Sequence, residues 1–204
     1  MTRTPAVGPV ALVLAAGAST RMGTGAAKAL IELGGVRMLD RVLSSLEAVG
    51  VEPLVVIGPP HGAAIRAALP ASVRTAWNPR PERGMLSSVQ TGLGELVAAP
   101  VMGALIWPVD VPLVQAVTVR RLLQAAQAEG AGRPVLPTHA GRGGHPLWLP
   151  ACRFADVLAL PEGATLRELR ARHPELRLEV TDAAVLRDLD TPADLAAARA
   201  SVPR

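Results

Sequence analysis

The chain has 204 residues, half of them apolar and 19% charged, so it can bury a full core and differs from a disordered protein. Its length is typical of one α/β domain, and we expect a single domain over residues 1–204, with a core from about 10 to 200. The net charge of +4 is spread thinly over a chain with three Trp, one Phe and no Tyr, which argues against nucleic acid as a partner because basic runs and stacking platforms are lacking.

The first apolar segment, residues 7–16, is shorter than the roughly 20 residues that a membrane helix needs, and it runs directly into a glycine-rich loop. A signal peptide is the alternative, since Arg3 and the small residues Ala15 and Ala16 fit its pattern. Cleavage there would separate a glycine-rich loop from its strand. Cys152 is the only cysteine, so no intrachain disulfide can form. We therefore expect a cytoplasmic protein without membrane contact.

Along the first two thirds of the chain, short apolar runs alternate with amphipathic stretches. This pattern is typical of strands and helices that alternate over a mostly parallel sheet. The strands are nearly all apolar, as expected when both faces of a sheet are covered. Strands are expected at 10–16, 53–57, 73–77 and 104–109, and helices at 38–49, 62–69, 85–97 and 116–129. The predicted fold class is α/β, a single three-layer, Rossmann-like domain with helices on both faces of the sheet.

The last third of the chain continues with strands and two helices that have clear start signals. Strands are expected at 134–137, 146–149 and 176–180. Thr165 and Glu168 have the spacing of a capping box, which predicts a helix to about residue 172. Thr191 followed by Pro192, with an acidic residue two positions later, predicts the start of a final helix.

The glycine-rich loop after the first strand contains small residues and one guanidinium. Small side chains let backbone N–H groups approach an oxyanion, Arg21 can clamp phosphate oxygens, and Lys28 can add a point charge. The loop lacks the P-loop pattern and the Gly-x-Gly-x-x-Gly order, which favours a mononucleotide site of another type. A tight turn at Gly17 and Gly23, with Arg21 in solvent, is an equal alternative from composition alone.

Two acidic positions can hold a cation. Asp110 follows the strand at 104–109, at the edge where open α/β sheets bind ligands, and Mg²⁺ needs only one or two carboxylates beside phosphate and water. The alternative is that Asp110 caps the next helix. Asp188 and Asp190 belong to an extended segment, and we expect their carboxylates to point to opposite sides, so that only one faces a site shared with Asp110. We choose Asp190 as the second ligand, with Asp188 in reserve; the alternative is that Asp190 only precedes a helix cap.

Two further segments carry polar groups between the predicted elements. Gly84, Ser87 and Ser88 open the helix at 85–97, where a helix start can bind an anion or a base edge. The alternative is plain capping by one of the two serines. Arg142 and His145 belong to a glycine-rich loop before a strand and can reach a ligand above the sheet, although a lone histidine is more often structural.

Four separated motifs resemble, in order, those of nucleotidyltransferases with a glycosyltransferase-A-like fold. Leu-Ala-Ala-Gly-Ala-Ser-Thr-Arg-Met-Gly, from residue 14, resembles the signature loop, and Asp110 stands in an Asp-x-Pro motif. The Gly-x-x-x-Ser-x-x-x-Gly-Leu stretch from Gly84 and the Gly-His-Pro motif at His145 are similar to those of molybdenum cofactor cytidylyltransferases. Asp190 lies in a similar closing motif. One spacing departs: four residues separate Met-Gly from Lys28, where close relatives have two.

The resemblance implies a Mg²⁺-dependent enzyme that transfers CMP from CTP to the terminal phosphate of molybdenum-loaded molybdopterin and releases pyrophosphate. It implies Asp110 and Asp190 as metal ligands and Arg142 and His145 as acceptor-binding residues. Catalytic roles are implied for Arg21, Lys28 and Asp110. Nucleotide binding is implied for Leu14, Ala15, Ala16, Gly17, Ser19, Arg21, Lys28, Gly84, Ser87 and Ser88.

Little acid–base chemistry is required, because a phosphate nucleophile is already ionised and catalysis consists of alignment and charge neutralisation. Leu-Ala-Ala-Gly, where guanylyl relatives have Leu-Ala-Gly-Gly, favours CTP over GTP, because the extra methyl narrows the space beside the base. The alternatives are a related enzyme that uses GTP, a sugar phosphate or another small phosphate, and a non-catalytic nucleotide- or cofactor-binding protein. The expected partners are small molecules, with transient contact to a molybdoenzyme or its chaperone.

Overall fold

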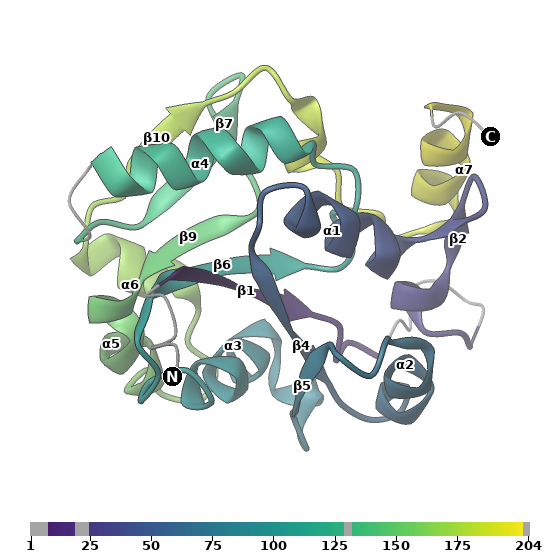
Figure 1. Cartoon of the computed structure of the whole chain (residues 1–204), viewed down its shortest axis with the longest axis horizontal. Helices are drawn as coiled ribbons and strands as arrows, with labels where there is room; N and C mark the ends of the chain where they lie inside the picture. Colours follow the sequence, from purple (N-terminus) through teal and green to yellow (C-terminus); the bar gives the residue numbers. More distant parts are fainter. Residues whose placement is uncertain (1–7, 19–24, 129–131, 202–204) are drawn as a thin grey trace, which may run out of the picture.

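The computed structural model describes residues 8–18, 25–128 and 132–201 (Figure 1). Its centre is a sheet in the order β10-β7-β9-β6-β1-β4-β5, with β8 paired to β7. The strands are β1 (Gly8–Leu14), β4 (Glu52–Ile57), β5 (Arg74–Trp77), β6 (Val101–Pro108), β7 (Val135–His139), β8 (Arg142–Gly143), β9 (Leu147–Pro150) and β10 (Leu176–Glu179). The prediction of an α/β fold around a mostly parallel sheet is confirmed.

Helices cover both faces of the sheet (Figure 1). They are α1 (Met38–Glu47), α2 (Gly62–Ala68), α3 (Met85–Gly94), α4 (Ala116–Ala128), α5 (Phe154–Leu158), α6 (Leu166–Arg172) and α7 (Pro192–Ser201). Apolar residues of α1, α2 and α4 pack on one face, and those of α3, α5 and α6 pack on the other. Within the described ranges, no helix combines the length and the apolar character that crossing a bilayer requires.

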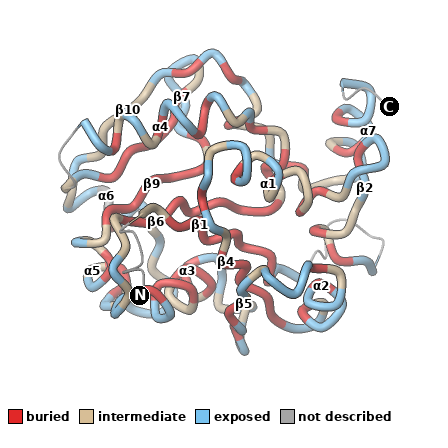
Figure 2. The backbone as a smooth tube through the Cα atoms, in the orientation of Figure 1, coloured by how far each residue is buried: buried red, intermediate tan, exposed pale blue. Residues whose placement is uncertain are grey.

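The alternation of side chains along β1 explains why both faces are apolar. Ala11 and Val13 belong to one core cluster, while Val10, Leu12 and Leu14 belong to the cluster on the opposite face. The central strands are accordingly buried along their length, and exposed residues concentrate on the outer helices and turns (Figure 2). A strand of this kind is covered on both sides, as the nearly continuous apolar sequence predicts.

The parallel strands β1, β4 and β6 end at one edge of the sheet. Leu14 is paired with Val56 of β4 and with Pro108 of β6, so the three chains leave the sheet at the same level. Strand β9 runs antiparallel to β6, with Leu147 opposite Ile106. The loop that precedes β9 therefore meets this edge as well, and loops from four strands gather there.

A two-stranded hairpin and the last helix extend this edge (Figure 1). Strands β2 (Glu32–Leu33) and β3 (Val36–Arg37) form the hairpin. A small third core joins it to α7 and to the segment before α7. Its buried members are Leu33, Met38, Leu189, Leu195 and Ala198. The closing segment is thus held close to the region that follows the glycine-rich loop.

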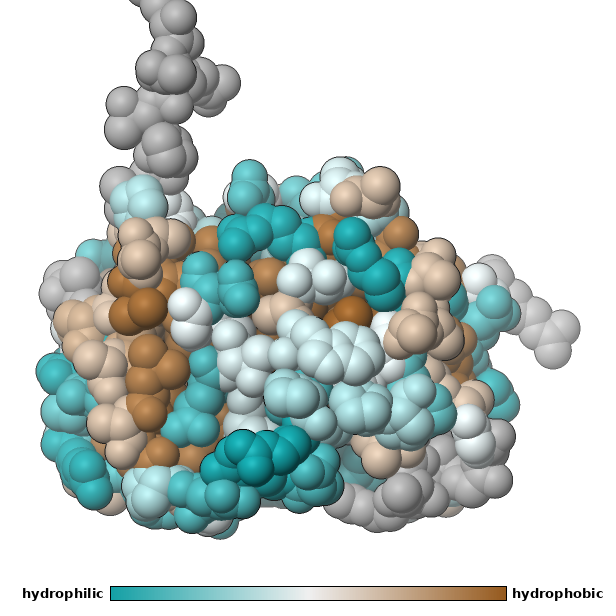
Figure 3. Space-filling view, turned by 90° about the horizontal axis from the view of Figure 1, so that it is seen from below, coloured by the Kyte–Doolittle hydropathy of each residue, from teal (hydrophilic) through white to brown (hydrophobic). Residues whose placement is uncertain are grey.

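The molecule seen from below the view of Figure 1 shows hydrophilic side chains around a band of hydrophobic ones (Figure 3). Large apolar side chains that are exposed in the described part of the chain come from different elements. They are Val36, Trp77, Met85, Val97 and Val117. No helix among the described residues therefore presents a continuous exposed apolar face.

Candidate functional site

One lysine joins the two aspartates chosen from the sequence. Lys28 opens a short 3-10 helix, and its Nζ donates to Asp110 Oδ2 at 3.3 Å and to Asp190 Oδ1 at 2.5 Å. The Lys28 side chain is only 14% exposed, compared with 28% for Asp110 and 31% for Asp190. Partial burial reduces the screening of these ion pairs by water. The structure thus brings together three predicted residues that are far apart in the sequence.

The turn that carries Asp110 is fixed by backbone and indole hydrogen bonds. Trp107 is fully buried, and its Nε1 donates to Val111 O at 2.9 Å. On the other side, Leu189 N donates to Asp110 O at 2.8 Å, which joins the closing segment directly to the end of β6. The two aspartates are therefore placed by the backbone, and their relative position does not depend on Lys28.

The carboxylate that contacts the start of α4 belongs to Asp182, not to Asp110. Asp182 is 7% exposed, and its Oδ2 accepts from Gln115 N at 2.9 Å and from Thr118 Oγ1 at 2.8 Å at the start of α4. Its Oδ1 accepts from Ala184 N at 3.1 Å, so the same carboxylate joins α4 to the segment that leads to Asp190. The carboxylate of Asp110 remains directed at Lys28.

Capping likewise does not occupy the carboxylate of Asp190. Thr191 and Asp194 cap α7 reciprocally, with Asp194 N donating to Thr191 Oγ1 at 3.2 Å and Thr191 N donating to Asp194 Oδ2 at 2.8 Å. The sequence prediction of this helix start is confirmed. Asp190 contributes its backbone N–H, which donates to Asp194 Oδ2 at 3.1 Å, while its carboxylate accepts from Lys28.

Asp188 lies close enough to this cluster to interact with both carboxylates. Partial desolvation raises the pKa of Asp188, and the negative charges of Asp110 and Asp190 raise that pKa further, whereas Lys28 lowers it. We expected Asp188 and Asp190 to point to opposite sides, but residues two apart in an extended segment lie on the same side, so that expectation was wrong in its geometry. The segment is irregular, and the charges of Asp110, Asp188 and Asp190 lie near one lysine.

The donor set fits a divalent cation. Two carboxylates accept from the same ammonium nitrogen, so one small cation can lie within reach of both, and Mg²⁺ and Mn²⁺ prefer such oxygen ligands. Among the described residues, no group of three or more His, Cys, Asp or Glu side chains is arranged to hold a metal ion. A cation here would take its other ligands from phosphate oxygens and water.

The glycine-rich loop borders the same cluster across a small cavity of about 80 Å³. Gly17 is exposed at its rim, and a side chain there would meet no atom within 4 Å. Ser19 and Arg21 lie outside the described residues. The lining residues are Leu14, Ala15, Gly17, Lys28, Ala29, Val109 and Asp110. Within the described part of the loop, Gly17 therefore lines the same cavity as Lys28 and Asp110.

The position of Ala16 differs from the one that the argument for CTP over GTP assumed. It is only 2% exposed, and its methyl carbon lies 3.4 Å from the position that a Cβ on Gly58 would occupy. The methyl group of Ala16 therefore packs into the protein interior and offers almost no surface to a base. In this structure the methyl group does not narrow the space beside a nucleotide base by direct contact.

The serines at the start of α3 are organised by Asn78, whose role the sequence analysis missed. Asn78 is 2% exposed, and its Nδ2 donates to Ser87 Oγ at 2.9 Å and to Ser88 Oγ at 3.0 Å. Ser87 Oγ also donates to Gly84 O at 2.8 Å, and neither serine is the N-cap, which is Gly84. The Asn-Pro pair at 78–79 signalled a loop, but only the fold shows that its amide reaches α3.

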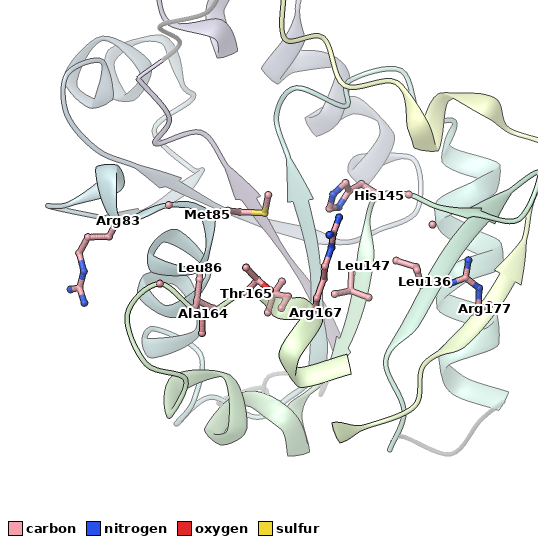
Figure 4. A pocket seen from close by; sticks show the side chains of 15 residues that line it. Arg83, Met85, Leu86, Leu136, His145, Leu147, Ala164, Thr165, Arg167 and Arg177 are labelled. Carbon is pink, nitrogen blue, oxygen red and sulfur yellow. The ribbon is translucent and has the colours of Figure 1, made fainter. Parts of the chain in front are cut away.

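His145 lines a second, larger cavity of about 670 Å³ at the same edge (Figure 4). Its backbone N donates to Val185 O at 2.8 Å, which joins the β8–β9 loop to the segment that leads to Asp190. Gly84 lines this cavity too. Arg142 is exposed on β8 and is absent from the described lining, so the structure does not bring the two predicted acceptor residues to one surface.

With this geometry in place, comparison with known families decides the class of protein. The sequence model of a family described as "MobA-like NTP transferase domain" matches residues 11–177. The chain belongs to the MobA-like NTP transferase family. It is therefore a nucleotidyltransferase, and the resemblance drawn from its motifs is confirmed. Asp190 lies beyond the matched residues, whereas Gly17, Lys28, Asp110 and His145 lie within them.

Curated relatives match this MobA-like domain over part of their length. The chain is 38% identical over 134 residues to a protein named bifunctional enzyme IspD/IspF from Clavibacter michiganensis subsp. michiganensis, covering 59% of the chain and 31% of that protein. Proteins named bifunctional protein GlmU, such as that of Acidithiobacillus ferrooxidans, are matched over 26% of their length. The chain thus spans about a quarter to a third of the curated relatives that it matches.

Solved structures of similar proteins match nearly the whole chain. Rv0371c from Mycobacterium tuberculosis H37Rv has a TM-score of 0.83 and 26% identity, covering 97% of this chain and 100% of that one. A second structure of Rv0371c, in complex with manganese, has a TM-score of 0.78 at 24% identity, covering 95% and 99%. Molybdopterin-guanine dinucleotide biosynthesis protein A from Archaeoglobus fulgidus has a TM-score of 0.72 at 16% identity, covering 96% of this chain and 98% of that one, which shows a shared fold.

Proposed function

We propose that this MobA-like domain transfers CMP from CTP to the terminal phosphate of a molybdopterin-type acceptor. An oxygen of the acceptor phosphate forms a new bond to the α-phosphorus of CTP, and the bond from that phosphorus to the β-phosphate oxygen breaks. Pyrophosphate leaves with the electron pair of the broken bond. The cluster of Lys28, Asp110 and Asp190, facing the glycine-rich loop across one cavity, is the observation that carries the proposal.

Asp110 and Asp190 would hold the divalent cation, with Asp188 near enough to add negative charge. When bound, Mg²⁺ supplies charge neutralisation at the triphosphate. The structure of the similar protein Rv0371c in complex with manganese is compatible with a divalent ion as cofactor. Mg²⁺ is our choice for this chain because two carboxylates beside a triphosphate form the usual protein share of a Mg²⁺ site.

The chain's own residues would perform the remaining tasks. Lys28 would place a positive charge beside the phosphates. Backbone N–H groups around the open Gly17 can approach an oxyanion closely, and Arg21 is proposed to add a bidentate clamp. A phosphate nucleophile needs no general base at neutral pH, so alignment and charge neutralisation supply the rate acceleration.

The choice of CTP and of molybdopterin rests on the resemblance of Leu-Ala-Ala-Gly, Gly-x-x-x-Ser and Gly-His-Pro to molybdenum cofactor cytidylyltransferases. Ala16 is buried, so its methyl group gives no direct steric argument for CTP. The fold shared with a molybdopterin-guanine dinucleotide biosynthesis protein is compatible with this acceptor. A domain of the same family that serves another acceptor, as the names IspD and GlmU of the relatives suggest, is the main alternative.

The direct test combines the protein with Mg²⁺, each of the four NTPs and molybdenum-loaded molybdopterin, and identifies the product by mass. We expect the cytosine dinucleotide and pyrophosphate with CTP, with loss of pyrophosphate release in Asp110→Asn. Glu95→Gln is the matched control, because Glu95 is exposed at the end of α3 and away from both cavities. Efficient use of GTP would overturn the base assignment, and the absence of turnover with any NTP would refute catalysis.

A further inference from the structure

The larger cavity has one apolar wall and a set of guanidinium groups. Met85 is 50% exposed and lines the cavity, beside the edges of the core residues Leu86, Leu136 and Leu147, which are exposed by only 6%, 3% and 3%. Arg83, Arg167 and Arg177 line it from three different elements (Figure 4). An apolar wall beside several cations is a surface suited to a ligand that has a flat or apolar body and a negative charge.

Two of the three guanidinium groups already have protein partners. Arg83 pairs with Glu162 at 2.5 Å. Arg177 donates to Gly141 O at 2.8 Å and pairs with Glu175 at 3.1 Å. Within the part of the chain that the structure describes, the side chain of Arg167 makes no hydrogen bond or ion pair. Arg167 is therefore the guanidinium in this wall that a ligand can bind without displacing a carboxylate.

The position of Arg167 is fixed at its base by the helix that carries it. The capping box of Thr165 and Glu168 sets the start of α6, and Leu169 is 1% exposed in the core. Figure 4 shows the side chain of Arg167 extending from α6 toward His145. A guanidinium on an anchored backbone loses less conformational freedom when it binds an anion than one on a mobile loop.

The chemistry of the lining distinguishes between classes of acceptor. Its described residues include no Asp, Glu, Asn or Gln side chain. Hydroxyl groups of a sugar would therefore find few side-chain acceptors for their protons, whereas a phosphate finds donors from Arg167 and a polar ring in His145. A phosphomonoester on an apolar or aromatic body fits this lining better than a phosphate on a polyol.

The cavity also lies at the reacting edge of the sheet. Asp110 follows β6, and His145 precedes the neighbouring antiparallel strand β9. The hydrogen bond from His145 N to Val185 O ties this rim to the segment that carries Asp190. An anion held by Arg167 and His145 would thus belong to the second substrate of the reaction that we propose.

We propose that Arg167, with His145, forms the subsite for the anionic group of the acceptor, and that the acceptor is a phosphomonoester with an apolar or aromatic body. This assignment rests on the proposed function where it concerns turnover, but anion binding can be tested without turnover. Arg167 belongs to none of the motifs that resemble the nucleotidyltransferases, and in the sequence it is only a residue inside a capped helix.

The test compares Arg167→Gln with Arg172→Gln, a matched control because Arg172 is exposed on the same helix and does not line the cavity. Titration calorimetry without NTP would measure the binding of phenyl phosphate and of glucose 1-phosphate. We expect Arg167→Gln to weaken phenyl phosphate binding by at least about tenfold, the cost of one charge-assisted hydrogen bond, with no change in Arg172→Gln. Arg167→Lys should recover part of the loss, because it keeps the charge.

Equal binding of phenyl phosphate by wild type and Arg167→Gln would overturn the subsite. Tighter binding of glucose 1-phosphate than of phenyl phosphate would overturn the class of acceptor. In turnover assays, we expect Arg167→Gln to raise the KM for the acceptor and to leave the KM for the NTP unchanged. If Arg167→Gln releases pyrophosphate normally and its KM for the acceptor is unchanged, the subsite fails and the proposed function stands. If the wild type turns over no NTP but Arg167→Gln still binds phenyl phosphate more weakly than the wild type does, the subsite stands and the proposed function fails.

Discussion

Asp182→Ala should destabilise the protein strongly, although Asp182 lies outside both cavities. The carboxylate is 7% exposed and accepts from Gln115 N, Thr118 Oγ1 and Ala184 N at 2.8 to 3.1 Å. Hydrogen bonds to a charged acceptor each contribute about 1.5–3 kcal/mol. The three losses are not additive, because the hydroxyl of Thr118 can rotate and water can enter the vacated space. We therefore expect a total loss of about 3–5 kcal/mol of unfolding free energy.

Urea unfolding followed by circular dichroism would measure this loss as a lower midpoint at constant slope. For a chain of this size, the melting temperature should fall by roughly 10 °C. Asp156→Ala is the matched control, since its carboxylate is 42% exposed and pairs with Arg153 at 3.4 Å and His173 at 3.2 Å. Such a surface pair contributes at most about 1 kcal/mol. Equal losses in the two variants would refute the assignment of Asp182 as the buried link between α4 and the closing segment.

Three further perturbations test the site. Lys28→Met should lower kcat/KM about 100-fold or more, because a positive charge at the phosphates is removed; an unchanged rate of pyrophosphate release would exclude that role. Asp188→Asn should reduce the rise in melting temperature that Mg²⁺ or Mn²⁺ causes. Because the pKa of Asp188 is raised from 3.8, the native state binds more protons than the unfolded state, so metal-free wild type should lose stability as pH rises from 3.8 through that raised pKa. Asp188→Asn should lack this loss in thermal melts at several pH values, and identical profiles would contradict the argument. Gly144→Ala should cost about 1–3 kcal/mol or more, because its Cβ would lie 2.2 Å from Val185 O, whereas Gly94→Ala, which meets no atom within 4 Å, should be nearly neutral in the same melts.

The fold could be predicted from the sequence because its local signals agree with its packing. The apolar runs at 53–57 and 104–109 correspond to β4 and β6, and the capping signals at Thr165 and Thr191 correspond to the starts of α6 and α7. The hairpin β2–β3 was missed because each of its strands has two residues, too few to show a period. The direction of β9 was also beyond the sequence, because the order and direction of strands depend on pairing between distant segments.

The candidate site was predictable where a motif fixes both residue type and place, as at Lys28, Asp110 and Asp190. It was not predictable where the contact depends on tertiary structure. Asn78 organises two serines on another element, and Arg167 reaches a cavity formed by segments that are distant in sequence. The opposite placement expected for Asp188 and Asp190 misapplied the period of a strand, in which residues two apart lie on the same side.

The hydrogen bond from Leu189 N to Asp110 O ties the proposed cation site to the last part of the polypeptide to be made. The strands β1, β4, β5 and β6 lie within the first 108 residues, whereas β7, β8, β9 and β10 follow later in the chain. The second carboxylate arrives only after residue 190 has emerged. The proposed cation site would therefore be the last part of the domain to be completed during synthesis, and a chain released before residue 190 would lack one of its two carboxylates.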